Sequence, residues 1–191
     1  MSSDNVMTIR TEKTPNPNSL KYNLGTTLLP GSSANFPTKD SAARSPLARR
    51  LFEADGVTGV FVGPDFITIT KEEGREWSDI NMAVAPQLEA FFESGDPVLQ
   101  GNKPADYKEI GADTADPELV EHIKELLDER VRPAVAQDGG DIIYRGYEDG
   151  VVYLEMIGAC SGCPSSTATL KIGVERMLQE NIPEIKEVRA M

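Results

Sequence analysis

The sequence predicts an α+β protein built from two small domains, and three observations lead to this fold class. At 191 residues, the chain is long for one small domain and long enough for two. Apolar residues recur at the spacing of short strands in some stretches and at the spacing of helices in others, in both halves of the chain. A polar, turn-rich stretch separates the halves. We therefore expect a first domain over residues 1–94, a flexible linker over residues 95–115 and a second domain over residues 116–191.

The first domain is expected to have the order β-β-α-β-β-α, and it opens with two short strands. Residues 7–11 alternate like an edge strand, and residues 19–24 form the second strand. Between them, residues 14–18 contain two prolines and two asparagines, which favour a turn. Residues 25–41 show no periodicity, so we expect a long loop there.

The remaining elements of the first domain are a helix, a hairpin and a second helix. Ser45 followed by Pro46 is typical of a helix start, because serine caps the first turn and proline suits it. Residues 57–63 and 66–70 are expected to pair as a hairpin. Pro86 lies within the second helix, so we expect a kink or a restart there. The apolar stripe of this helix, with the tryptophan as a core residue, consists of Trp77, Ile80, Val84, Leu88 and Phe91.

The second domain is expected to have the order α-β-β-α-β with a mixed three-stranded sheet. Its first helix starts at Asp116-Pro117 and weakens at Pro133. His122, the only histidine, lies at the edge of the apolar stripe, so we expect a surface residue and not a metal ligand. The stripe consists of Leu119, Ile123, Leu126 and Leu127.

Two glycines follow this helix in residues 138–141, Asp-Gly-Gly-Asp. They supply backbone freedom that other residues lack. One interpretation is a turn from helix to strand, which we favour. The other is a loop packed close to the cysteines, and the two are compatible.

The strands of the second domain surround its second helix. Residues 142–147 and 151–157 flank a tight turn and are expected to form a hairpin. Residues 185–188 form a last strand, which should join the sheet parallel to residues 151–157 through a right-handed crossover. The helix before this strand has the apolar stripe Leu170, Val174, Met177 and Leu178.

The charge balance and the apolar pattern limit the classes of partner that the protein can bind. Acidic residues outnumber basic ones by 31 to 19, and the net charge of −12 argues against nucleic-acid binding, which depends on lysine and arginine. No apolar run approaches the roughly 20 residues that span a bilayer, so we expect no membrane contact. Residues 1–6 lack the features of a targeting peptide. We expect a cytoplasmic protein, or a mitochondrial matrix protein if the chain is a mature organellar form.

Catalytic motifs are missing from the sequence. It contains no phosphate-binding glycine loop, no Ser/His/Asp arrangement and no HExxH, and its carboxylates are scattered along exposed helical faces. We therefore predict that the protein is not an enzyme.

The two cysteines, Cys160 and Cys163, are the only ones in the chain, and they are the candidate site. They lie in a short loop between a strand and a helix, and Pro164 suits the first position of that helix. A helix N-terminus favours negative charge, so thiolates should form readily there. In a reducing compartment, a Cys-x-x-Cys pair is more typical of metal or redox chemistry than of a structural disulfide.

The number of cysteines decides what kind of metal centre can form. Structural zinc and the common iron–sulfur clusters require about four protein ligands, whereas one chain offers two thiols. A four-ligand centre therefore requires two chains, most simply a homodimer with a twofold axis that brings the two loops together. Such a centre would lie on loops near solvent. Incoming thiols can displace its cysteine ligands and take the cluster, as a carrier requires.

A thiol–disulfide oxidoreductase that uses Cys160 and Cys163 is the alternative, because Cys-x-x-Cys at a helix N-terminus also describes a redox site. The motif alone does not separate the two functions. The surroundings favour a metal site, because the loop has no aromatic residue before its first cysteine and the motif comes late in its domain.

Both halves of the chain resemble the Nfu family of iron–sulfur carrier proteins, and together the two resemblances cover nearly the whole chain. The second half closely resembles the NifU-like C-terminal domain at residues 130–133, 138–141 and 158–166. The first half resembles the Nfu-type N-terminal domain at residues 14–21 and in the hairpin of residues 61–70.

The resemblance implies a carrier that binds a 4Fe–4S cluster between two subunits, with Cys160 and Cys163 as the cluster ligands. A 2Fe–2S form is a further option. The carrier would receive its cluster from upstream assembly factors, either A-type carriers or a scaffold, and deliver it to apo iron–sulfur enzymes during their maturation. The N-terminal domain would recognise partners, and no functional residues carry over for it.

Overall fold

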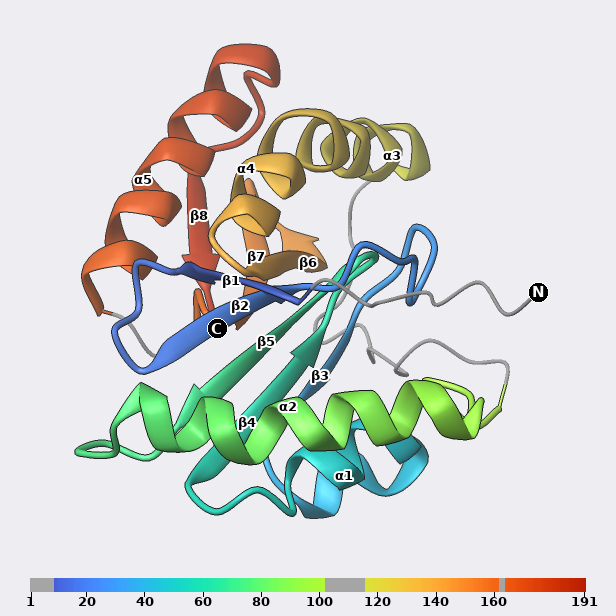
Figure 1. The fold of residues 1–191 in the computed structure, drawn as a ribbon. Coiled ribbons are helices and arrows are strands. Elements are labelled where there is room, and N and C mark those ends of the chain that lie inside the picture. The colour runs from blue at the N-terminus through green and yellow to red at the C-terminus, as the bar shows by residue number, and fades with distance from the viewer. Residues whose placement is uncertain (1–8, 102–115, 162–163) are drawn as a thin grey trace. The chain divides into compact units, whose positions relative to one another are not determined.

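The computed structural model contains helices and strands in both halves of the chain, which confirms the α+β class (Figure 1). It describes residues 9–101, 116–161 and 164–191. Contacts divide the chain into two compact units, Met1–Ala105 and Asp106–Met191. Most of the predicted linker lies outside the described residues, so its bounds stay a prediction.

Among the described residues, five antiparallel strands form the sheet of the first unit, in the order β1-β2-β5-β4-β3 (Figure 1). The predicted hairpin is confirmed as β4 and β5. The strands are β1 (Arg10–Lys13), β2 (Ser19–Asn23), β3 (Ala34–Phe36), β4 (Val57–Val62) and β5 (Phe66–Lys71).

The expectation of a long loop over residues 25–41 is wrong. This stretch contains β3 and leads into a short 3-10 helix, η1 (Asp40–Arg44). β3 pairs with β4 and places Phe36 beside Val60. Three residues are too few to show a strand period, so it is the pairing with β4 that defines this strand.

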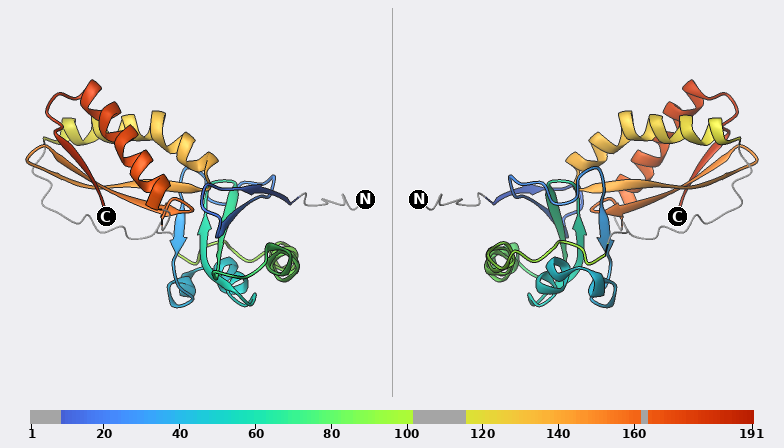
Figure 2. Two further views of the ribbon diagram at one scale, coloured as in Figure 1. Left: turned by 90° about the vertical axis from the view of Figure 1, so that its left-hand side faces the viewer. Right: turned by 90° about the vertical axis from the view of Figure 1, so that its right-hand side faces the viewer.

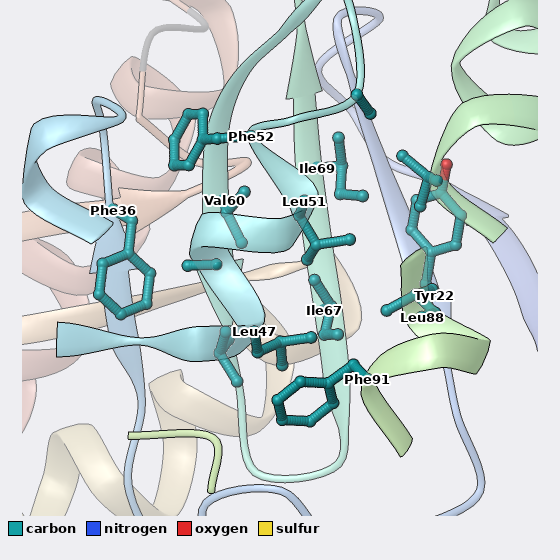
Figure 3. Close-up of a cluster of buried hydrophobic side chains, with 14 of the residues drawn as sticks. Tyr22, Phe36, Leu47, Leu51, Phe52, Val60, Ile67, Ile69, Leu88 and Phe91 are labelled. Carbon is teal, nitrogen blue, oxygen red and sulfur yellow. The ribbon is translucent and has the colours of Figure 1, made fainter. Parts of the chain in front are cut away.

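One face of the sheet forms the core of the first unit together with α1 (Pro46–Leu51) and α2 (Trp77–Ser94) (Figure 3). Leu20, Ile69 and Val60 lie side by side across β2, β5 and β4. Against them, the two helices place the fully buried side chains of Leu47, Leu51, Ile80, Val84 and Leu88. The predicted stripe of α2 is thus confirmed for its central residues.

The starts of the helices follow local chemistry, whereas Pro86 does not interrupt its helix. Ser45 caps α1 as predicted, because its Oγ accepts a hydrogen bond from the N–H of Ala48 at 3.0 Å. Helix α2 runs without a break through Pro86, so the expected restart is wrong. Pro86 is exposed, and water can hydrate the carbonyl of Met82 that loses its helical donor to the proline.

The turn over residues 14–18 is a hydrogen-bonded unit held against α2. The N–H of Asn18 donates to Oδ1 of Asn16 at 3.0 Å. Nε1 of Trp77 donates to the carbonyl of Pro17 at 3.2 Å. Trp77 therefore packs at the edge of the core, half-buried, and joins the turn to the helix.

The described start of the predicted linker packs on the first unit. Gly95 ends α2 in a left-handed conformation with φ of 68°. After it, the N–H of Gln100 donates to the carbonyl of Arg44 at 2.7 Å, and Ser45 Oγ donates to the carbonyl of Val98 at 2.6 Å. These residues continue the first unit past residue 94.

The second unit has a three-stranded sheet in the order β6-β7-β8, with helices on one face (Figure 2). β6 and β7 are antiparallel, and β8 joins β7 in parallel, which confirms the mixed sheet. The first predicted helix is divided into α3, a π-helical turn η2 and α4. The elements are α3 (Pro117–Leu126), η2 (Leu127–Val131), α4 (Arg132–Gln137), β6 (Gly140–Glu148), β7 (Val151–Gly158), α5 (Pro164–Asn181) and β8 (Glu187–Ala190).

The core of the first unit can be tested at Leu88. We expect Leu88→Ala to lower the free energy of unfolding by about 2–5 kcal/mol, because it leaves a cavity under α2. Urea unfolding followed by the fluorescence of Trp77, the only tryptophan, reports on this unit. Met82→Ala is the control on the same helix, where 70% exposure should limit the change to about 0.5 kcal/mol. Equal losses in the two variants would contradict this core.

Tyr22 makes the first unit sensitive to alkaline pH. Burial raises the pKa of Tyr22 above its ordinary value, and its hydroxyl donates to Oδ1 of Asn81 at 2.5 Å. The folded state therefore holds this proton more tightly than the unfolded state. Its stabilising effect is complete below about pH 10 and is lost as the pH rises further. We expect the urea midpoint of the wild type to fall more steeply above about pH 10 than that of Tyr22→Phe, and equal slopes would refute the assignment.

Candidate metal centre

The candidate loop begins where β7 ends and leads into α5, as the sequence predicts. Gly158 ends β7 with φ of 72°, a left-handed conformation that glycine adopts without strain. Pro164 is the first residue of α5. Cys160 thus lies in the short connection between a strand and a helix.

The Cys160 side chain is buried, which corrects for this cysteine the expectation of a centre on loops near solvent. Only 5% of Cys160 is exposed, and it packs with Ile142, Met156 and the rest of the second unit's core. The local sequence suggests a surface loop, but the loop folds back onto the start of β6. Cys160 is therefore a core residue as well as a candidate ligand.

Gly140 provides the space for this thiol. A Cβ atom at Gly140 would lie 2.5 Å from the carbonyl oxygen of Ile157 and 2.8 Å from Sγ of Cys160. Both distances are shorter than carbon atoms tolerate, so a side chain at this position would displace the cysteine or the strand. Gly140 pairs with Gly158 across β6 and β7, directly before the loop.

Hydrogen bonds hold the backbone of the loop from two sides. The N–H of Ala159 donates to the carbonyl of Gly139 at 3.1 Å. On the other side, Oγ1 of Thr167 in α5 donates to the carbonyl of Cys160 at 3.0 Å. Within the loop, Oγ of Ser161 donates to the carbonyl of Gly158 at 2.8 Å. The position of Cys160 is therefore defined by β6, β7 and α5 together.

Both interpretations of residues 138–141 are confirmed. Gly139 has φ of 81° and makes the turn from α4 into β6. The same glycine accepts the hydrogen bond from Ala159, so the turn packs against the cysteine loop.

Arg132 and Asp141 form an ion pair beside this turn. Nε of Arg132 lies 2.8 Å from Oδ1 of Asp141, and Nη2 lies 2.6 Å from Oδ2. The side-chain hydrogen bonds to Asp141 raise the pKa of Arg132 above its ordinary value, so the guanidinium stays charged. Nη1 also contacts Oδ1 of Asp128 at 3.1 Å.

Sequence reasoning did not identify the residues that support the loop. Thr167 carries no signal, because its contact with Cys160 depends on how α5 starts. The stretches that hold Arg132 and Asp141 stand out in the family resemblance, but nothing in the sequence predicts that the two side chains meet.

The other predicted site residues have different outcomes. Cys163 lies outside the described residues, so its role as a ligand stays a prediction. His122 is exposed on α3, as expected. In the described part of the chain, no three His, Cys, Asp or Glu side chains gather in a way that could hold a metal ion. Within that same part, no helix is long and apolar enough to cross a membrane.

The close contact at Gly140 can be tested by substitution. We expect Gly140→Ala to lower the thermal unfolding temperature of the second unit, because the new methyl group collides with the Ile157 carbonyl and with Sγ of Cys160. Differential scanning calorimetry measures the change. Gly173→Ala in α5 is the control, because no atom outside its own stretch of helix lies within 4 Å of its Cβ position and alanine favours a helix. If Gly140→Ala unfolds at the wild-type temperature, the close contact does not exclude a side chain at position 140.

Two family profiles match the chain, and each corresponds to one unit. The profile described as scaffold protein Nfu/NifU N terminal matches residues 9–95. The profile described as NifU-like domain matches residues 123–189.

Whole-chain relatives agree with both matches. The mitochondrial NFU1 iron-sulfur cluster scaffold homolog of Homo sapiens is 49% identical over 183 residues, which cover 95% of this chain and 71% of that protein. The homolog of Drosophila sechellia is 53% identical over 183 residues. The chain spans 64% of the length of that relative. The solution NMR structure of a NifU-like protein from Saccharomyces cerevisiae is 28% identical and covers 53% of this chain and 92% of its own, with a TM-score of 0.45.

The two matches follow one another along the chain in the same order as the two compact units. Together with the identity to the human relative over 95% of the chain, they establish that this protein belongs to the Nfu family, with an Nfu/NifU N-terminal domain followed by a NifU-like domain.

Proposed function

We propose that this protein is an iron–sulfur cluster carrier that holds a 4Fe–4S cluster between two subunits. The observation that carries the proposal is that an Nfu-family chain has two cysteines in all, spaced Cys-x-x-Cys in the loop between β7 and α5. The relatives are named as iron–sulfur cluster scaffold proteins, which supports the same cargo.

The ligand count argues for sharing. A 4Fe–4S cluster takes about four cysteine thiolates, and each chain supplies Cys160 and Cys163. Two copies related by a twofold axis complete the set, and neither copy completes it alone. Thiolates are the ligands that iron–sulfur clusters prefer, and a helix N-terminus favours their charged form.

Sharing also explains delivery. Each subunit holds the cluster through two bonds, so thiolates of an apo-protein can replace those of one subunit and then those of the other. Every step exchanges one iron–thiolate bond for another and needs no change of oxidation state. The protein thus acts by ligand exchange and not as an enzyme.

The partners follow from this role. The cluster would come from upstream assembly factors, A-type carriers or a scaffold, and would go to apo iron–sulfur enzymes. The Nfu-type N-terminal domain would recognise these partners. The named relatives are mitochondrial, and the protein would act in the mitochondrial matrix or in the cytoplasm.

Anaerobic reconstitution with iron and sulfide tests the proposal. We expect the broad visible absorption of a cluster, about four irons per two chains, and a shift from monomer to dimer mass on a sizing column. Cys163→Ala should abolish all three, because it removes half of the thiolates near the helix start. Circular dichroism of this variant checks that its fold is intact.

Three outcomes would contradict the proposal. A single chain that keeps a complete cluster would remove the argument for sharing. Zinc in stoichiometric amount, in protein made under iron-replete conditions, would favour a structural metal site. Turnover in an insulin-reduction assay that depends on Cys160 would favour the thiol–disulfide oxidoreductase.

A further inference from the structure

We propose that Arg132 is a positioning residue for Cys160, acting through Asp141 and Gly140. The inference rests on the proposed function in one respect, namely that Cys160 is a cluster ligand. The contacts that carry it lie within the second unit and do not involve the cluster.

The π-helical turn η2 sets the place of Arg132. Pro133 has no N–H, and in a regular α-helix its ring would collide with the carbonyl of Glu129. A π-helical turn over Leu127–Val131 comes directly before this proline, and α4 starts at Arg132. Such turns inside helices frequently occur at functional sites. The guanidinium of Arg132 lies at the start of β6, where it meets Asp141.

Two parallel hydrogen bonds fix Asp141 to Arg132. They measure 2.8 Å and 2.6 Å and join both nitrogens of one guanidinium edge to both carboxylate oxygens. This arrangement fixes orientation as well as distance, which a lysine cannot do. The Asp141 side chain is 7% exposed, so it cannot exchange this partner for bulk water.

Asp141 directly follows Gly140, the glycine that leaves space for the Cys160 thiol. It pairs with Ile157 across β6 and β7, and the preceding Gly140 pairs with Gly158. Oδ1 of Asp141 also accepts the N–H of Ile142 at 2.8 Å, so the carboxylate is fixed to the first residues of β6. A shift of Asp141 would therefore move Gly140, whose missing side chain leaves the space that Sγ of Cys160 occupies.

A second ion pair in the same unit provides a matched comparison. Arg145 pairs with Glu155 between β6 and β7, and the Arg145 side chain is 8% exposed. Glu155 lies opposite Ile143 in the sheet, further along β6 from the cysteine loop than Asp141. Removing Arg145 should cost stability without acting on the start of β6.

The test measures the reactivity of Cys160 in the reduced apo-protein. All variants carry Cys163→Ala, so that Cys160 is the only cysteine in the full chain. The rate of its reaction with a small thiol reagent is measured from zero to sub-denaturing urea. In parallel, urea unfolding followed by circular dichroism gives the global stability of each variant.

We expect Arg132→Gln to raise the reaction rate of Cys160 at least tenfold, with little dependence on urea. Weak dependence on urea indicates a local opening that exposes little surface. Arg132→Lys should give an intermediate rate, because it keeps the charge and loses the paired geometry. Arg145→Gln should raise the rate only as far as its loss of global stability predicts. Asp141→Asn should match Arg132→Gln, and the double variant should add little to either.

Two results of this reactivity assay would overturn the proposal. One is a wild-type rate in Arg132→Gln. The other is a rise that global stability fully accounts for, as in Arg145→Gln, which would leave Arg132 a purely structural role.

A second measurement separates this inference from the proposed function. In chains that keep both cysteines, we expect a chelator to remove the reconstituted cluster several-fold faster from Arg132→Gln than from the wild type. If the wild type binds no cluster, the proposed function fails, and the reactivity of Cys160 still decides whether Arg132 positions it. If both proteins lose the cluster at one rate while the reactivity differs, the positioning does not extend to the bound cluster and the proposal is overturned.

Discussion

The second unit depends on the close approach of Cys160 to the start of β6. The turn after α4, the end of β7 and the loop before α5 meet there, and a side chain at Gly140 would collide with the Ile157 carbonyl and with Sγ of Cys160. The candidate ligand is thus part of the hydrophobic core, and the energy that folds the unit also places the thiol.

This arrangement suits the proposed site, which a second copy would complete. When each chain supplies half of a ligand set, its half must be placed before the partner arrives, because ordering a loop at that moment would weaken binding. Cys160 is fixed by its own core, by Thr167 and by the turn at Gly139. The bidentate contact between Arg132 and Asp141 adds a polar element to this support at the start of β6.

In the first unit, the distinctive stretch of residues 14–18 has a structural role. In residues 14–18 the N–H of Asn18 donates to the Asn16 side chain, and the carbonyl of Pro17 accepts a hydrogen bond from Trp77, so this stretch forms a hydrogen-bonded turn. Strong periodicity predicted the stripe of α2 and the hairpin of β4 and β5. The prediction was wrong for β3, which needs the pairing with β4, and at Pro86, whose exposed position lets water compensate for the missing hydrogen bond.

The sequence by itself determined which residues are candidates for chemistry and how most of the chain folds locally. The place of Cys160 between a strand and a helix and the surface position of His122 follow from residue type and spacing, because these are local or periodic properties of the chain. The mixed sheet follows from the order of the elements and the right-handed crossover rule. Tertiary structure alone decided that Cys160 is buried and that Arg132 meets Asp141. Both depend on segments distant in the chain that pack at one point, and packing depends on shape and on hydrogen-bond geometry that no spacing rule contains.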